Sequence, residues 1–146
     1  MLGSAPSATG PASTLVLPRT DMAVQILNRE NFVEVVSRTG ITLVDCCAEW
    51  CAPCKVFSPI FQRAAEKHPQ HAFGTLDTHE EREIADKLEI KHIPTLLLYR
   101  DGLLLLHEPA SLDVGHLDQI VEQAESLDMD EVRAAIASER ARAEEE

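Results

Sequence analysis

All four cysteines of this 146-residue chain lie in one segment, DCCAEWCAPCK, residues 45–55. A β-rich run, residues 41–44, leads into the segment. A helical pattern with apolar residues three and four positions apart, residues 55–67, follows it. The cysteines are therefore expected between a strand and a helix. Four thiols so close together could form a metal site, a structural disulfide or a reactive thiol pair.

A metal site made of all four cysteines conflicts with this placement. Cys46 and Cys47 are adjacent at the end of the predicted strand, so their side chains point to opposite faces of the sheet. Only one of them could join Cys51 and Cys54 as a ligand, although a three-cysteine site completed by a distant histidine stays possible. A structural disulfide is a weaker hypothesis, because a loop with two intervening residues removes little entropy from the unfolded chain.

A reversible thiol pair is the best interpretation of Cys51-Ala52-Pro53-Cys54. At the N-terminus of a helix, unpaired backbone N–H groups and the helix dipole favour a thiolate over a thiol. A thiolate is the attacking species in disulfide exchange, and a second cysteine within one helical turn can resolve the mixed disulfide that forms. The spacing therefore predicts redox chemistry carried by Cys51 and Cys54.

The composition narrows the range of partners. The net charge is -12, and an acidic surface repels nucleic acid and anionic membranes, so neither is expected as a partner. Residues 1–21 are mostly small residues with Gly and Pro, which predicts a flexible N-terminal extension, and they show no export signal. We therefore expect a cytoplasmic protein. In such a reducing compartment, clustered cysteines are more often reactive or metal-binding than joined in structural disulfides.

The remaining pattern alternates strands and helices and ends in a hairpin. The predicted strands are 24–27, 41–44, 72–76, 93–99 and 103–106, and the predicted helices are 29–37, 55–67, 80–88 and 115–127. The order βαβαβαββα predicts an α/β sandwich of three layers, with a mixed central sheet flanked by helices. Residues 128–146 predict an acidic C-terminal helical tail with a thin apolar edge, either solvated or used for docking.

Two separate motifs within this predicted order of strands and helices resemble the thioredoxin family. The first runs from Val44-Asp45 through Ala48-Glu49-Trp50-Cys51 to Pro53-Cys54-Lys55, with Pro59 following. The second is Ile93-Pro94-Thr95, which is similar to the cis-proline segment of that family, and Asp101-Gly102 falls where its last hairpin turns. The resemblance covers about residues 22–127 and implies a thioredoxin domain there. It leaves the extension and the tail uncovered.

The resemblance implies a role for each matching residue. Cys51 is expected to be the exposed nucleophile and Cys54 the buried resolving thiol. Asp45 is expected beneath Cys54, with a pKa raised by desolvation, as the base that accepts the proton of Cys54. Trp50 and Pro53 are expected to shape the rim for the substrate, while Pro94 in the cis form and the backbone of Ile93 receive the substrate strand.

The chain departs from the family pattern at several of these positions. Ala52 replaces the usual glycine between the cysteines. Thr75 falls where many members carry a lysine near the buried acid, so Asp45 is expected to depend mainly on desolvation. Cys46 and Cys47 stand where bulky residues are common, and we expect both to be small core residues. The alternative is that Cys47 is a third reactive thiol or a metal ligand.

The leading functional hypothesis is a protein-disulfide reductase that works by thiol–disulfide exchange through a redox-active Cys51–Cys54 disulfide, with no other cofactor and no metal. The absence of a histidine between the cysteines favours a reductant over an oxidant. The resemblance implies protein disulfides as substrates, a thioredoxin reductase as electron donor, a role in cell redox homeostasis and electron transport, and a monomer. The alternatives are a thiol-based metal-binding module and a non-catalytic interaction subunit that uses the fold as a scaffold.

Overall fold

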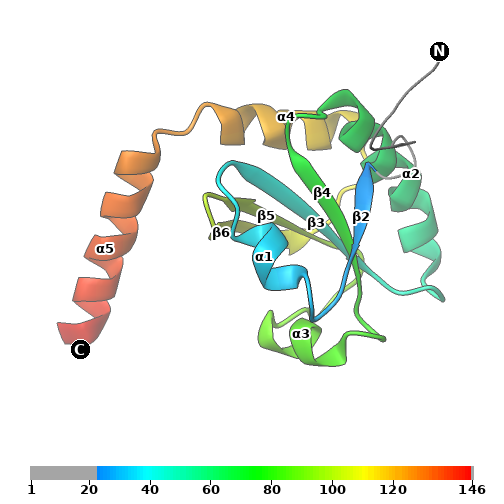
Figure 1. Cartoon of the computed structure of the whole chain (residues 1–146), viewed down its shortest axis with the longest axis horizontal. Coiled ribbons are helices and arrows are strands. Elements are labelled where there is room, and N and C mark those ends of the chain that lie inside the picture. The colour runs from blue at the N-terminus through cyan, green and yellow to red at the C-terminus, as the bar shows by residue number, and fades with distance from the viewer. Residues whose placement is uncertain (1–22, 146) are drawn as a thin grey trace, which may run out of the picture.

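Five strands form the central sheet of the protein, in the order β2-β4-β3-β5-β6 (Figure 1). The computed structural model describes residues 23–145, so the extension expected at 1–21 lies outside the described residues. The strands are β2 (Val24–Leu27), β3 (Ile41–Cys47), β4 (Ala72–Asp77), β5 (Thr95–Arg100) and β6 (Leu103–Pro109). The helices are α1 (Phe32–Val36), α2 (Ala52–Lys67), α3 (Arg82–Lys87), α4 (Val114–Glu125) and α5 (Met129–Glu145).

The sheet is mixed, as the sequence predicted. β2 and β3 both pair with β4 in parallel, whereas β5 pairs antiparallel with β3 and with β6. Asp101 and Gly102 connect β5 to β6 with φ values of 54° and 83°, the pair of positive φ angles that a two-residue type I′ hairpin turn requires. The α/β class and the βαβαβαββα order are thereby confirmed.

Helices cover both faces of the sheet, and the alternation of side chains along β3 assigns residues to each face. One core joins Leu43 and its neighbours to the apolar sides of α2 and α4, among them Phe57, Phe61 and Val121. The opposite core joins Val44 and Cys46 to α1, with partly buried residues of α3 against it. Asp45 lies on the same side of the strand as Leu43, which is the face covered by α2.

All four predicted helices begin at a different residue from the sequence-based prediction, and the start of α2 matters for function. α2 begins at Ala52 rather than at residue 55, so Cys54 lies in its first turn and Cys51 is its N-cap residue. Pro53 is compatible with this start, because a proline in the first turn of a helix removes no intrahelical hydrogen bond. The early start brings both thiols to one helix terminus.

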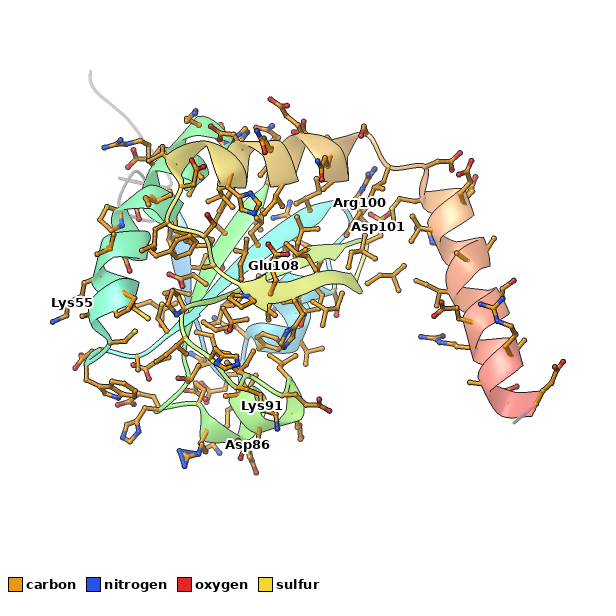
Figure 2. The ribbon with its side chains drawn as sticks, turned by 180° about the vertical axis from the view of Figure 1, so that it is seen from behind. Lys55, Asp86, Lys91, Arg100, Asp101 and Glu108 are labelled. Atoms are coloured by element: carbon orange, nitrogen blue, oxygen red, sulfur yellow. The ribbon has the colours of Figure 1, made fainter. Side chains whose placement is uncertain are left out.

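α5 continues the chain beyond the sheet and extends away from it (Figure 1). Met129 is its buried residue, and most of the other side chains are exposed. Arg133 forms an ion pair of 3.0 Å with Asp101 at the hairpin turn, close to Arg100 at the end of β5 (Figure 2). Within residues 23–145, no helix combines the length and the apolar composition that crossing a bilayer requires.

Candidate active site

The N-terminus of α2 holds the two cysteines of the motif. Cys51 is the N-cap residue, and its Sγ accepts a hydrogen bond of 3.3 Å from the backbone N–H of Cys54. An N–H at this position has no partner within the helix, so it is available to a sulfur that carries negative charge. Lys55 follows on the outer side of α2 (Figure 2). The backbone thus positions Cys51 Sγ directly before the first turn that contains Cys54.

Cys51 is less accessible than the sequence predicted. Only 5% of its surface is exposed, so the expectation of an exposed nucleophile is wrong for this conformation. The physical reason is the direction of the side chain: Cys51 packs with Cys47 and Cys54, and Ile93 lies against the three. Cys54 is buried, as expected.

The segment before β5 is distant from the cysteines in the sequence but lies beside this helix terminus. The Ile93–Pro94 peptide bond is cis, as the resemblance predicted. The carbonyl oxygen of Ile93 lies 4.0 Å from Cys51 Sγ. Trp50 is 72% exposed and Pro53 is exposed too. The structure therefore places the four residues expected to receive the substrate around the Cys51 thiol or next to it in the chain.

Asp45 is buried on the face of the sheet that lies under α2. It is 2% exposed, and burial raises the pKa of its carboxyl group to about 6, although a hydrogen bond from Cys47 acts in the opposite direction. Thr75 pairs with Asp45 across β3 and β4, and its hydroxyl donates to the backbone carbonyl of Asp45 rather than to the carboxylate. Desolvation therefore dominates, as the absence of a lysine at Thr75 predicted.

Cys54 needs a base in order to react. Burial raises the pKa of its thiol to about 11, and the neighbouring Cys51 adds to the effect. A thiol with such a pKa is almost entirely protonated near neutral pH, and only the thiolate attacks a disulfide. A proton acceptor within reach of Cys54 is therefore part of any exchange reaction at this site.

Cys47 and Cys46 differ in their surroundings, as their alternation on β3 predicted. Cys46 is fully buried in the core beside α1, where desolvation raises the pKa of its thiol. Cys47 packs with Cys51 and Cys54, and its Sγ donates a hydrogen bond of 2.9 Å to Asp45 Oδ1. The sequence analysis missed this bond. The parity of Asp45 and Cys47 on one strand was the available signal.

A cavity of about 540 Å³ opens beside the thiols. Its lining includes Cys47 and Cys54 together with residues of β2, β4, α2 and the segments that follow β3 and β4, namely Ile26, Leu27, Ala48, Glu49, Lys55, Ser58, Thr75, Asp77, Glu80 and Glu81. A bulky residue at position 47 or a lysine at position 75 would extend into this region. The cavity thus lies where this chain has Cys47 instead of a bulky residue and Thr75 instead of a lysine.

The cysteines are also potential metal ligands. Among residues 23–145, no three Cys, His, Asp or Glu side chains are arranged to hold a metal ion together. Cys47, Cys51 and Cys54 are close to one another, but their packing is that of a small apolar cluster. The geometry of the described residues therefore offers nothing in favour of the metal-binding hypothesis.

Comparison with known proteins gives one consistent family. The thioredoxin family model matches residues 23–124. A Streptomyces coelicolor protein assigned as thioredoxin 2 is 41% identical over 117 residues, which cover 80% of this chain and 87% of that protein. Thioredoxin-1 of Saccharomyces cerevisiae is 35% identical over 81 residues, which cover 56% of this chain and 79% of that protein.

Solved structures agree on the fold. The thioredoxin of Plasmodium falciparum superposes with a TM-score of 0.63 at 27% identity, over 68% of this chain and 98% of that chain. The oxidised form of mitochondrial thioredoxin 3 from Saccharomyces cerevisiae gives a TM-score of 0.63 at 24% identity, over 71% of this chain and 98% of that chain. The second likeness supports the fold alone.

Proposed function

The chain belongs to the thioredoxin family of thiol–disulfide oxidoreductases, and from this membership we propose that Cys51 and Cys54 are the dithiol with which it reduces disulfides in other proteins. Thioredoxins act through such a cysteine pair. The observation that carries the assignment is the hydrogen bond from the backbone N–H of Cys54 to Cys51 Sγ at the N-terminus of α2. It singles out Cys51 as the sulfur prepared to bear negative charge.

The proposed reaction has two exchange steps. The Cys51 thiolate attacks one sulfur of the substrate disulfide, so that a Cys51–substrate disulfide forms and the other substrate sulfur leaves as a thiolate. Cys54 then loses its proton to a base and attacks Cys51 Sγ, which releases the second substrate thiolate and leaves a Cys51–Cys54 disulfide. The substrate gains two electrons, and the dithiol loses them.

We assign the other site residues by their positions. Asp45 is the buried base of the second step, because its pKa of about 6 leaves it ionised near neutral pH and ready to accept a proton. Trp50 and Pro53 form the exposed rim, and Ile93 and Pro94 receive the substrate chain. The carbonyl of Ile93 beside Cys51 Sγ supports that last role, since an extended substrate that reaches Cys51 can pair with the backbone there.

Insulin reduction by dithiothreitol tests the reaction class, with turbidity of the released B chain as the readout. The native protein should accelerate the reaction, and Cys51→Ser and Cys54→Ser should each abolish the acceleration. Cys46→Ser is the matched control, because Cys46 lies on the opposite face of β3 and should be dispensable. A native protein without activity would contradict the proposal.

We further propose a thioredoxin reductase as the electron donor, a monomer as the active form and the cytoplasm as the location. The family supports the first, and the acidic surface and clustered free thiols are compatible with a soluble protein of a reducing compartment. Oxidation of NADPH by a bacterial thioredoxin reductase, dependent on this protein and on insulin, would support the donor. No coupling at any protein concentration would contradict it.

A further inference from the structure

We propose that Cys47 relays the proton of Cys54 to Asp45 in the second exchange step. Cys47 is thus a third cysteine that takes part in the reaction without being oxidised. The inference rests on the proposed function, since it concerns the step in which Cys54 attacks the mixed disulfide. Three features of the site carry it: the contacts of the Asp45 carboxylate, the contacts of the Cys54 thiol, and the protonation of Cys47 itself.

The first feature is the hydrogen bond of the base. Cys47 Sγ donates to Asp45 Oδ1 over 2.9 Å, and within residues 23–145 it is the side chain that donates to this carboxylate. Both residues are buried, at 2% and 8% exposure for Asp45 and Cys47. A proton that reaches the Asp45 carboxylate from the thiol cluster therefore arrives along the Cys47 S–H bond.

The second feature is the surroundings of Cys54. Within the described residues, its thiol packs with those of Cys51 and Cys47 in one buried cluster. Because the S–H bond of Cys47 is directed at Asp45, the Cys47 sulfur is able to accept the S–H of Cys54. The base and the thiol that it must deprotonate are thus bridged by Cys47, which contacts both.

The third feature is the protonation of Cys47. Burial, followed by the charge of Asp45, raises the pKa of its thiol far above the usual range. Such a group stays a thiol and is a poor nucleophile. It can nevertheless accept one proton while it gives up another, which is what a relay requires. This contrasts with a third redox thiol, which would have to ionise.

The relay moves two protons and breaks no other bond. The Cys54 S–H proton moves to Cys47 Sγ while the Cys47 S–H proton moves to Asp45 Oδ1. Cys54 becomes the thiolate that attacks Cys51 Sγ, Cys47 is again a thiol, and Asp45 is a neutral carboxylic acid. Cys47 borders the cavity beside the thiols, so the proton can later return to water by the same side chain.

The test separates the two exchange steps in time. The reduced protein is mixed with the aromatic disulfide DTNB in a stopped-flow instrument, and the release of thionitrobenzoate is followed. The first release reports the attack by Cys51, and the second reports the attack by Cys54. We expect Cys47→Ala and Cys47→Val to slow the second release by about 10-fold or more, the order that loss of a positioned proton acceptor gives. The first release should be unchanged.

Two controls make the result specific. Cys47→Ser keeps a group that both accepts and donates a proton and should stay within about 3-fold of the native rate. Cys46→Ala removes the adjacent buried thiol on the opposite face and should change neither release. A second release unaffected by Cys47→Ala and Cys47→Val would overturn the relay, and so would a serine variant as slow as the alanine variant.

A double-mutant cycle with Asp45→Asn distinguishes the relay from a packing role. If both residues act on one proton path, Cys47→Ala should add little, within about 2-fold, to the slowing caused by Asp45→Asn. Multiplying effects would overturn the proposal. Failure of the first release in the native protein would instead contradict the proposed function, so the two failures are distinguishable.

Discussion

Asp45 is a buried ionisable residue that has no cationic partner among residues 23–145. Its carboxylate contacts a thiol instead of a lysine, and burial holds its pKa near 6. The folded protein thus binds a proton at Asp45 more tightly than the unfolded chain does. Between about pH 4 and pH 6 the native state carries this extra proton, so the free energy of unfolding falls as the pH rises through that range.

Asp45→Asn should therefore stabilise the protein near neutral pH. The pKa difference from 3.8 to about 6 corresponds to a gain of up to about 3 kcal/mol at pH 7. At pH 4 the gain should shrink to below about 1 kcal/mol, because the Asp45 carboxyl is then neutral in the folded state and about half protonated in the unfolded chain. Urea unfolding at pH 7 and at pH 4 measures both quantities.

Asp86→Asn is the matched control for this experiment, because Asp86 lies exposed on α3 (Figure 2). It should change the free energy of unfolding by less than about 0.5 kcal/mol at either pH. An Asp45→Asn protein that is no more stable than the native one at pH 7 would show that desolvation does not govern this carboxyl group.

The residues of the site differ in how far the sequence could predict them. The spacing of Cys51 and Cys54 could be read directly from the sequence. The cis state of Pro94 followed only from the resemblance to the family, because base rates alone favour a trans bond. The burial of Cys51 did not follow, since it depends on the packing of Ile93 from another element. The bond between Cys47 and Asp45 was missed. The alternation of side chains along a strand predicts which face of the sheet each one occupies, but not which residue it contacts.

Among the elements, β2 and β4 are in close contact where the side chain of Leu27 packs against Gly74. A Cβ atom at this position would lie 2.7 Å from Cδ1 and 2.8 Å from Cγ of Leu27, which is itself buried. Gly74→Ala should therefore force Leu27 to move and should lower the free energy of unfolding by about 1–3 kcal/mol. Thermal unfolding followed by circular dichroism measures this loss.

Gly115→Ala provides the matched comparison in α4. The nearest atom to an added Cβ there is Asp113 Oδ1 at 3.8 Å, which is an ordinary contact. The substitution should leave the stability unchanged or raise it by up to about 1 kcal/mol, since alanine favours the helix. Equal losses from both substitutions would contradict the close approach of β2 and β4.

α1 shows why element boundaries were harder to predict than element types. The helix was expected over residues 29–37, but it spans Phe32–Val36. Asn28 Oδ1 accepts from the backbone N–H groups of Glu30 and Asn31, while Asn31 Oδ1 accepts from that of Asn28. These local bonds hold a turn where the apolar pattern alone predicted the first helical residues.

At the scale of the whole molecule, the site lies within the sheet and α2, and the tail stands apart from it. The thioredoxin family model matches residues 23–124, and we propose a catalytic domain at 22–127 with a separate tail at 128–146. The Arg133–Asp101 ion pair joins an exposed arginine to a half-buried aspartate at the surface and should contribute under about 1 kcal/mol. Met129 is the buried residue of α5 and should contribute about 1–3 kcal/mol.

Removal of residues 128–146 should therefore leave insulin reduction within about 2-fold of the native rate, while the free energy of unfolding falls by about 1–3 kcal/mol. Activity is measured by turbidity and stability by urea unfolding. A truncated protein that is folded but inactive would contradict a solvated tail and favour the hypothesis of a scaffold that works through the tail.

The central claim is that Cys51 attacks the substrate and Cys54 resolves the mixed disulfide. The most direct measurement is mass spectrometry of the adduct formed when Cys54→Ser and Cys51→Ser proteins react with a peptide disulfide. The account predicts a stable adduct on Cys51 in the Cys54→Ser protein and no adduct on Cys54 in the Cys51→Ser protein. An adduct on Cys54 or Cys47 in place of Cys51 would contradict it.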